Sequence, residues 1–347
     1  MIHFQIISRQ LHFKLPAGTS RGTYTTRDVW YLYLTSDELP NRVGVGECAP
    51  LPRLSCDDVA DYSSILEQAC IRAAALGRVD TEALRPYPSI LFGLETAFRH
   101  LETGSFALWN TSFSRSEAGI PINGLIWMGD YHRMLEQIER KMQTGFRCIK
   151  LKIGAINFEE ELTLLRHIRA RFSAQEVELR VDANGAFDPS DALDKLKRLA
   201  ELDLHSIEQP IRAGQWETMA RLAADTPLPI ALDEELIGQH TPEEKQRLLD
   251  FIHPQYIILK PSLHGGMAGG REWMDEAEKR HIGWWITSAL ESNIGLNAIA
   301  QWCATFRNPL PQGLGTGALF TDNVEMPLEI RKDCLWYAGE EPRPAVG

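Results

Sequence analysis

A strand–helix unit recurs along the chain from Pro121 onward, as a short apolar run, a loop and an amphipathic helical stretch. Each unit takes roughly 25 to 30 residues, the length of one step in a parallel barrel. Seven strands of this kind, with a weaker candidate around Leu314, predict an α/β fold with a closed or nearly closed (β/α) barrel, that is, a modified TIM barrel. The clearest predicted strands are residues 148–153, 177–181, 204–207, 228–232, 256–259 and 283–286.

Helix starts within this region carry their own sequence signals. Asn157 with Glu160 forms a capping pair before an amphipathic stretch, and Thr241-Pro242 with Glu244 predicts another capped start. Asp188-Pro189 combines a capping residue with a proline suited to the first helical position, so we expect a helix to begin there.

The first hundred or so residues have a different order. Residues 28–35 and 42–48 have the β-branched and aromatic character of strands. Ser55, followed three residues on by Asp58, is expected to open a helix that runs to about residue 75, and another helix is expected over 89–101. Strands followed by helices, without alternation, indicate a separate α+β unit. We therefore expect an α+β domain over residues 1–118, completed by about 321–347, and a barrel domain over 119–320.

Charge and composition exclude several classes of partner. The chain has 36 Lys and Arg against 47 Asp and Glu, a net charge of −11, which argues against binding nucleic acid or an anionic membrane. No apolar run approaches the roughly 20 residues that span a bilayer, and residues 1–15 alternate like a strand rather than a signal peptide. The six cysteines show no metal-binding spacing and are typical of reduced thiols in a cytoplasmic protein. The oligomeric state, a homo-oligomer included, stays open.

Five ionisable residues stand where predicted barrel strands end, spaced 25 to 30 residues apart: Lys152, Asp182, Glu208, Asp233 and Lys260. Because parallel strands present their carboxyl ends at one rim, all five are expected at the rim where such barrels hold their active sites. One charge at a strand end is usually the solvated start of a loop. Five charged residues at the same position of their strand–helix units favour a shared site.

The three carboxylates, Asp182, Glu208 and Asp233, end successive strands, so their like charges converge and need a compensating cation. An all-oxygen set suits Mg²⁺, for which Mn²⁺ can substitute, and the absence of His and Cys disfavours Zn²⁺. Salt bridges to arginines are the structural alternative, but no arginine occupies an equivalent position.

The lysines predict the reaction class. Lys150 and Lys152 flank Leu151, so strand alternation points both into the barrel mouth, with Lys260 on the far side of the metal group. A base and a divalent cation acting on one carboxylate would remove the proton α to it, with Lys150 helping to hold the enediolate. The expected partner is a small anionic carboxylate substrate.

Nine segments carry a resemblance to a known family. KLK (150–152), VDANGAF (181–187), SIEQP (206–210), ALDEEL (231–236) and ILKPS (258–262) resemble the barrel of the muconate-lactonizing subgroup of the enolase superfamily. Within it, GECAPLPRLS (46–55), PINGLIWMG (121–129), TSALES (287–292) and QGLGTGALF (312–320) resemble the o-succinylbenzoate synthase family.

The resemblance implies roles for these positions. Lys152 becomes the acid/base, Lys260 the lysine that stabilises the intermediate, and the three carboxylates the Mg²⁺ ligands. The α+β unit becomes a capping domain whose residues 20–26 and 49–55 close over substrate. The implied reaction is the syn dehydration of 2-succinyl-6-hydroxy-2,4-cyclohexadiene-1-carboxylate. Substrate contacts are expected from Ser288, Gly315 and Thr316, the last two in a glycine run that either packs structurally or offers N–H groups to a carboxylate.

Three alternatives remain. Dipeptide epimerases carry an Asp-x-Asp pair where this chain has residues 287–292, which weakens that reading. An N-acylamino acid racemase shares both lysines and all three carboxylates, so these motifs leave it open. A non-catalytic barrel used as a binding protein should have lost at least one of the five residues, and all five are present.

Overall fold

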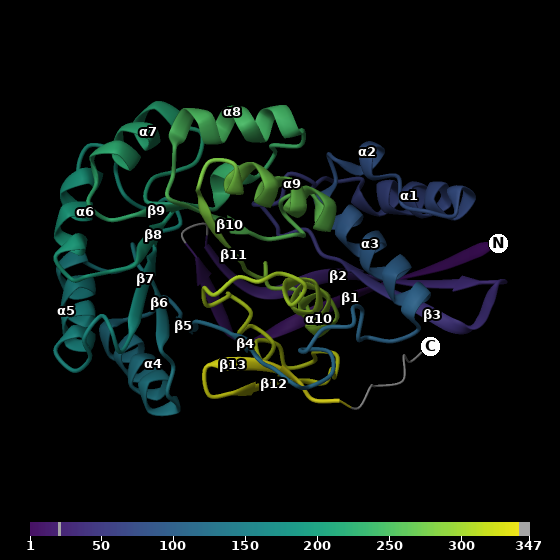
Figure 1. The fold of residues 1–347 in the computed structure, drawn as a ribbon, viewed down its shortest axis with the longest axis horizontal. Coiled ribbons are helices and arrows are strands. Elements are labelled where there is room, and N and C mark those ends of the chain that lie inside the picture. Colours follow the sequence, from purple (N-terminus) through teal and green to yellow (C-terminus); the bar gives the residue numbers. More distant parts are fainter. Residues whose placement is uncertain (20–21, 340–347) are drawn as a thin grey trace.

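The N-terminal part of the chain forms an antiparallel sheet. The computed structural model describes residues 1–19 and 22–339, and the sheet has the order β1 (Ile2–Thr19), β2 (Gly22–Ser36), β3 (Leu39–Cys48) (Figure 1). The C-terminal half of β3 is buried, while β2 alternates between exposed and buried residues. This pattern is expected for a sheet that packs one face on a core. The strands predicted at 28–35 and 42–48 are confirmed.

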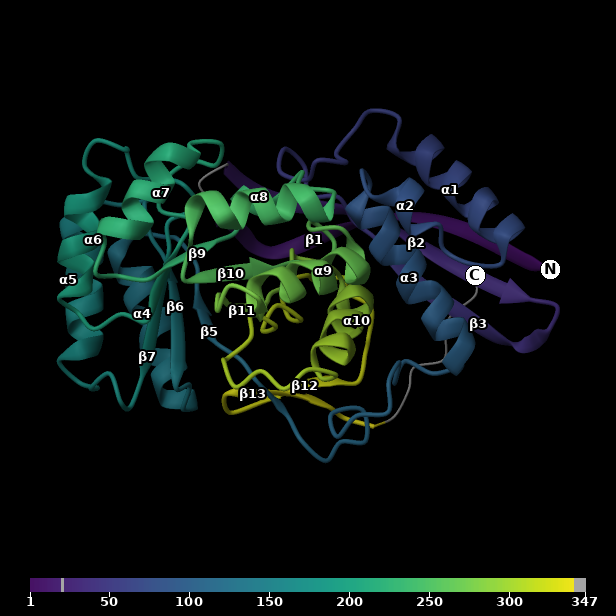
Figure 2. The same ribbon diagram turned by 45° about the horizontal axis from the view of Figure 1, so that its top comes forward.

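Three helices cover this sheet: α1 (Tyr62–Leu76), α2 (Thr81–Leu84) and α3 (Pro88–Thr103) (Figure 2). Contact between α3 and β3 depends on glycines, because a Cβ placed on Gly46 would lie 2.0 Å from the Gly93 carbonyl oxygen. The predicted start of the first helix at Ser55 is wrong, because α1 begins at Tyr62. The Asp58 carboxylate instead accepts a hydrogen bond from the Arg53 amide at 2.7 Å, within a turn that precedes α1.

The second unit is a parallel sheet of seven strands in the order β11-β10-β9-β8-β7-β6-β5, with helices around its outer side (Figure 1). Its strands are β5 (Gly124–Ile126), β6 (Cys148–Lys152), β7 (Glu178–Asp182), β8 (Ser206–Glu208), β9 (Ile230–Leu232), β10 (Tyr256–Leu259) and β11 (Gly283–Ile286). The helices that follow them are α4 (Tyr131–Thr144), α5 (Phe158–Arg169), α6 (Ala192–Ala200), α7 (Trp216–Asp225), α8 (Pro242–Ile252), α9 (Gly266–Glu278) and α10 (Asn293–Cys303), with a 3-10 turn η1 (Glu234–Leu236) before α8.

Helix starts agree with the sequence signals at Asn157 and Thr241. Asn157 caps α5, and Thr241 with Glu244 forms a complete capping box on α8. The start predicted at Asp188-Pro189 is wrong, because α6 begins at Ala192. The Asp188 carboxylate accepts hydrogen bonds from the Ser190 amide and hydroxyl in a turn ahead of the helix.

The seven-stranded sheet is linked at its two edges by residues 312–313, close to the weak candidate around Leu314. Thr287, which follows β11, bridges Gly313, and Ile122, which precedes β5, bridges Gln312, both in parallel register. No helix follows this eighth segment within the part of the chain that the structure describes. The chain continues to β12 (Leu328–Arg331) and β13 (Cys334–Tyr337), which form a small sheet with β4 (Ile120–Pro121).

The two units share a buried interface. Leu11, Phe13 and Val29 of the N-terminal sheet pack in one apolar cluster with Leu290 and Ile294 near the start of α10. Residues 319–321 also join β1 through backbone hydrogen bonds. The domain division at residues 118 and 320 remains a proposal. No helix among the described residues is long and apolar enough to cross a bilayer.

Candidate functional site

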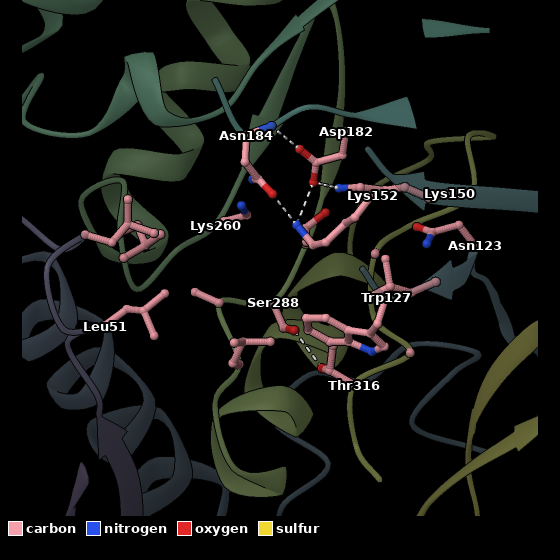
Figure 3. A pocket seen from close by; sticks show the side chains of 18 of the residues that line it. Leu51, Asn123, Trp127, Lys150, Lys152, Asp182, Asn184, Lys260, Ser288 and Thr316 are labelled. Carbon is pink, nitrogen blue, oxygen red and sulfur yellow. Dashed lines mark hydrogen bonds and ion pairs between the residues drawn. The ribbon is translucent and has the colours of Figure 1, made fainter. Parts of the chain in front are cut away.

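The five strand-end residues meet at one rim of the barrel, and Figure 3 shows three of them, Lys152, Asp182 and Lys260. In the parallel register Lys152 pairs with Asp182, and Asp182 pairs with Glu208 on the next strand. Asp233 and Lys260 directly follow β9 and β10. The alternation that predicted a common rim therefore brings all five side chains together.

Ion pairs connect these side chains. The Lys152 ammonium lies 2.9 Å from the Asp182 carboxylate, and the Lys150 ammonium lies 3.0 Å from the same oxygen while also pairing with Glu208. Lys260 pairs with Asp233 and lies 3.9 Å from Glu208. Lys150, Lys152 and the three carboxylates are buried and Lys260 is partly buried, so the carboxylates and lysines compensate each other's charge in a poorly solvated place.

Burial and neighbouring charges shift the pKa values of the three carboxylates in different directions. Burial raises the pKa of Glu208 to about 8, and the charge of Asp182 adds to this rise. Burial acts in the same direction on Asp182 and Asp233, but lysine charges outweigh it and leave the pKa of each lowered. Burial by itself would lower the pKa of Lys260, yet the surrounding carboxylates, Asp233 foremost, raise it.

The carboxylates fit a hard divalent cation by their chemistry. Within residues 1–19 and 22–339, no group of three or more His, Cys, Asp and Glu side chains is arranged so that it could hold a metal ion as it stands. The lysines provide the compensating charge in this arrangement. Nevertheless, Glu208 Oε1 and Asp233 Oδ1 are buried oxygens without a hydrogen-bond partner among the described residues. Together with Asp182 they form an all-oxygen donor set on three adjacent strands, which suits Mg²⁺.

Two residues that the sequence reasoning missed complete the charged wall. Asn184 accepts a hydrogen bond from the Lys152 ammonium at 2.7 Å and donates one to Glu234 at 3.1 Å. Asn184 has a φ of 43°, a left-handed conformation that asparagine tolerates better than most residues. Burial, followed by the charge of Asp233, raises the pKa of Glu234 to about 7. Asn184 lies close to Asp182 in VDANGAF, and Glu234 lies next to Asp233 in ALDEEL. This closeness to an expected metal ligand is the sequence signal by which both residues could have been predicted.

A pocket with about 830 Å³ of empty space opens in front of this wall. Lys150, Lys152 and Lys260 line one side together with Asp182. Apolar side chains form much of the remaining lining: Leu51, Leu54, Leu125, Trp127, Leu263, Ala289 and Leu290. The pocket thus joins a charged wall suited to a carboxylate with an apolar wall suited to a ring.

The three expected substrate contacts, Ser288, Gly315 and Thr316, also line this pocket, and the Ser288 and Thr316 hydroxyls lie 2.6 Å apart (Figure 3). Leu51 and Leu54 bring residues 49–55 over it, as expected for a covering segment. The loop expected at residues 20–26 is strand from Gly22 onward, in β2, where Tyr24 lines the pocket, while residues 20 and 21 lie outside the described part of the chain. The roles of these residues remain proposals.

Comparison with known proteins identifies the family. Residues 133–338 match the family model described as "Enolase C-terminal domain-like". The chain belongs to the enolase superfamily. Its fold therefore carries the superfamily's architecture, a parallel barrel sheet beside an N-terminal antiparallel sheet.

Several relatives of this superfamily member are similar over most of its length. An o-succinylbenzoate synthase from Desulfotalea psychrophila is 46% identical over 92% of this chain and 95% of its own length. The crystal structure of MenC from D. psychrophila LSv54 aligns with a TM-score of 0.82 at 41% identity, covering 96% of this chain and 99% of that one. An N-succinylamino acid racemase from Thermus thermophilus is 30% identical over 82% of this chain and 78% of its own length.

Proposed function

We propose that this chain is an o-succinylbenzoate synthase, a lyase that dehydrates 2-succinyl-6-hydroxy-2,4-cyclohexadiene-1-carboxylate to 2-succinylbenzoate. The observation that carries the proposal is a lysine pair, Lys152 and Lys260, that shares one pocket with apolar side chains in a chain 46% identical to a synthase of that name. The substrate matches this pocket, because it combines a ring, which prefers the apolar wall, with carboxylates, which prefer the lysines.

Lys152 is the proposed acid/base. Its ammonium is held by Asp182 at 2.9 Å and by Asn184 at 2.7 Å, so its position is fixed before substrate binds. As the neutral amine it would take the proton α to the ring carboxylate, and the ammonium so formed would then give that proton to the departing hydroxyl, which leaves as water. One lysine can serve both steps, since in a syn elimination both groups leave from the same face.

Asp182, Glu208 and Asp233 would hold Mg²⁺, for which Mn²⁺ can substitute. When bound, the ion would supply charge stabilisation for the enediolate. Lys260, which directly follows β10, lines the same pocket as Lys152 on β6 and would stabilise the same developing charge through its ammonium. Lys150, on the same strand face as Lys152, would assist in this role.

The apolar wall would hold the ring and exclude water. Leu51 and Leu54, from the segment after β3, and Trp127, after β5, line the pocket together with the lysines. A ring enclosed by these side chains would leave its carboxylate facing the charged wall. Removing water strengthens every electrostatic contact on that wall.

N-succinylamino acid racemisation is a second candidate, favoured by the 30% identical racemase and by lysines on two strands that face one pocket. In that reaction Lys152 and Lys260 would exchange protons on opposite faces of one carbon. Dipeptide epimerisation has less support. Glu291, the one carboxylate of residues 287–292, is buried, accepts hydrogen bonds from Ser262 and Ala289, and does not line the pocket.

One assay separates these activities. The purified protein is given the cyclohexadiene acid, with and without Mg²⁺, and in parallel an N-succinylamino acid in D₂O. We expect rapid Mg²⁺-dependent dehydration with slow or negligible deuterium exchange, and a loss on the order of 10³-fold in Lys152→Ala, the range of general acid–base catalysis. Fast exchange with no dehydration would replace the synthase by the racemase. Full turnover in Lys152→Ala would remove the proposed base.

The product would serve menaquinone or a related naphthoquinone pathway, in the cytoplasm. The six cysteines are all free, which is consistent with such a reducing compartment.

A further inference from the structure

A second cleft runs along helix α4, beside the catalytic pocket. Its empty space is about 1520 Å³, part of it open to solvent. Residues 14–17 of β1, the polar face of α4 and residues 315–319 form its walls. The cleft exists because the barrel has no eighth helix in the described structure: the chain passes from residues 312–313 through 315–319 to β12, and α4 lacks a helical neighbour on that side.

The charges lining this cleft are strongly unbalanced. Four cations, Lys14, Arg133, Arg140 and Lys141, line it with a single carboxylate, Glu136. These cations stand out in a chain whose net charge is −11. No ion pair within residues 1–19 and 22–339 involves any of these four, whereas several basic residues elsewhere on the barrel helices, such as Arg198 with Glu159, have acidic partners.

Lys141 shows that this arrangement is more than a solvated basic face. Its side chain is half-buried, its ammonium lies 4.5 Å from the centre of the Phe146 ring, and burial lowers its pKa. The aromatic ring offers only a weak attraction to the cation. A partly desolvated ammonium without a carboxylate partner therefore gains more from a bound anion than an exposed lysine does.

The helix also connects this cleft to the catalytic pocket. The Gln137 side chain accepts a hydrogen bond from the Trp127 amide at 2.9 Å and donates one to the Trp127 carbonyl at 3.1 Å. Trp127, Leu125, Gly315 and Thr316 line both cavities. They form a wall between the lysine-lined pocket and the α4 cleft, so the two cavities are adjacent but distinct.

We propose that the α4 cleft is an accessory binding site for a small polyvalent organic anion bearing carboxylate or phosphate groups, held by Arg133, Arg140 and Lys141. Two or three negative charges would balance the excess of cations over Glu136. The site is separate from the catalytic lysines, and it does not depend on the reaction that the pocket catalyses.

The test is calorimetric titration of the metal-free full-length protein at fixed ionic strength. Two probes distinguish the sources of negative charge: tricarballylate, with three carboxylates, and inorganic pyrophosphate. We expect at least one probe to bind, and an Arg140→Gln/Lys141→Gln double variant to weaken it at least tenfold. The matched control, Lys197→Gln on α6, removes an exposed lysine for which no ion pair is found among the described residues, and should leave binding unchanged.

The possible results distinguish binding in the α4 cleft from binding in the catalytic pocket. Arg133→Gln, an exposed single change that should not disturb packing, is expected to weaken the same probe by a smaller factor, and retained circular dichroism checks that each variant is folded. Failure of both probes to bind would overturn the proposal. Binding that survives the double variant but disappears in Lys152→Ala would also overturn it, since it would place the anion in the catalytic pocket. Because no substrate is used, neither result bears on the dehydration activity.

Discussion

Glu47 allows a direct test of how burial of a carboxyl group makes the stability of this protein depend on pH. This carboxylate belongs to β3 of the N-terminal sheet, yet it caps a helix of the barrel: it accepts hydrogen bonds from the backbone amides of Ser292 and Gly295, each at 2.8 Å, at the start of α10. It also accepts the Ser292 hydroxyl hydrogen, and the residue is fully buried. The perturbation is Glu47→Gln, which keeps the shape and cannot ionise.

The expected magnitude follows from the pKa. Burial, the largest influence, raises the pKa of Glu47 to about 7 from an ordinary 4.5. The folded protein therefore holds this proton more tightly than the unfolded chain does. The stability that the protonated group contributes is complete below pH 4.5 and is lost as the pH rises through 7. The loss is about 3 kcal/mol, at about 1.4 kcal/mol per pH unit. The α10 N-terminus favours the charged form by up to about 2 kcal/mol, but the pKa of Glu47 is raised, so burial outweighs this effect.

The assay is urea unfolding followed by tryptophan fluorescence at pH 5.5 and pH 8. Gln loses part of the hydrogen bonding at both pH values, so Glu47→Gln is less stable than the wild type at pH 5.5. We expect that deficit to shrink by about 2–3 kcal/mol at pH 8, because only the wild type pays the ionisation cost. Glu67→Gln, an exposed carboxylate on α1, controls for the loss of one charge. A deficit that stays constant, or widens at pH 8, would refute the reasoning.

Three further outcomes are expected. Asn184→Ala removes the acceptor 2.7 Å from the Lys152 ammonium, so steady-state kinetics should show kcat falling on the order of 10- to 100-fold with KM nearly unchanged; an unchanged kcat would show that Asn184 does not position the base. Mg²⁺ at a hundred times its Kd should stabilise the wild type by about 2.7 kcal/mol in thermal unfolding, but not Asp233→Asn; equal stabilisation of both would place the ion elsewhere. Gly46→Ala puts a Cβ 2.0 Å from the Gly93 carbonyl oxygen and should cost about 3 kcal/mol or more in urea unfolding, so a near-neutral result would mean that α3 can shift from β3.

The rim of the barrel was predictable because it depends on local periodicity. An apolar run followed by one charge fixes both the strand and the direction of its last side chain, and this placed Lys152, Asp182 and Lys260 at one rim. Asn184 and Glu234 were not predicted in the same way, because they lie beyond the strand ends, in a turn and in the short 3-10 turn η1, where the sequence has no periodic signal. The start of α6 was missed for a related reason, since an aspartate can satisfy a turn as well as a helix.

Contacts between the two units were not predictable from local patterns. Glu47 and Ser292 are 245 positions apart, and nothing near either residue indicates the other. Glu95 on α3 likewise accepts hydrogen bonds from the amides of Met267 and Ala268 at the start of α9. Both carboxylates appear in the sequence as ordinary polar residues of one unit, and only the three-dimensional arrangement shows which helix each one serves.

This arrangement determines how the catalytic pocket can open. Glu47 ties the end of β3 to α10, and two residues later the Ala49 carbonyl accepts a hydrogen bond from buried Arg27 at 2.6 Å. The backbone is thus anchored immediately before Leu51 and Leu54 reach the pocket. Substrate admission should therefore need only a short swing of the residues beyond Ala49, while the two units stay docked. Swapping the N-terminal unit for that of a relative would succeed only if the donor supplied both helix-capping carboxylates.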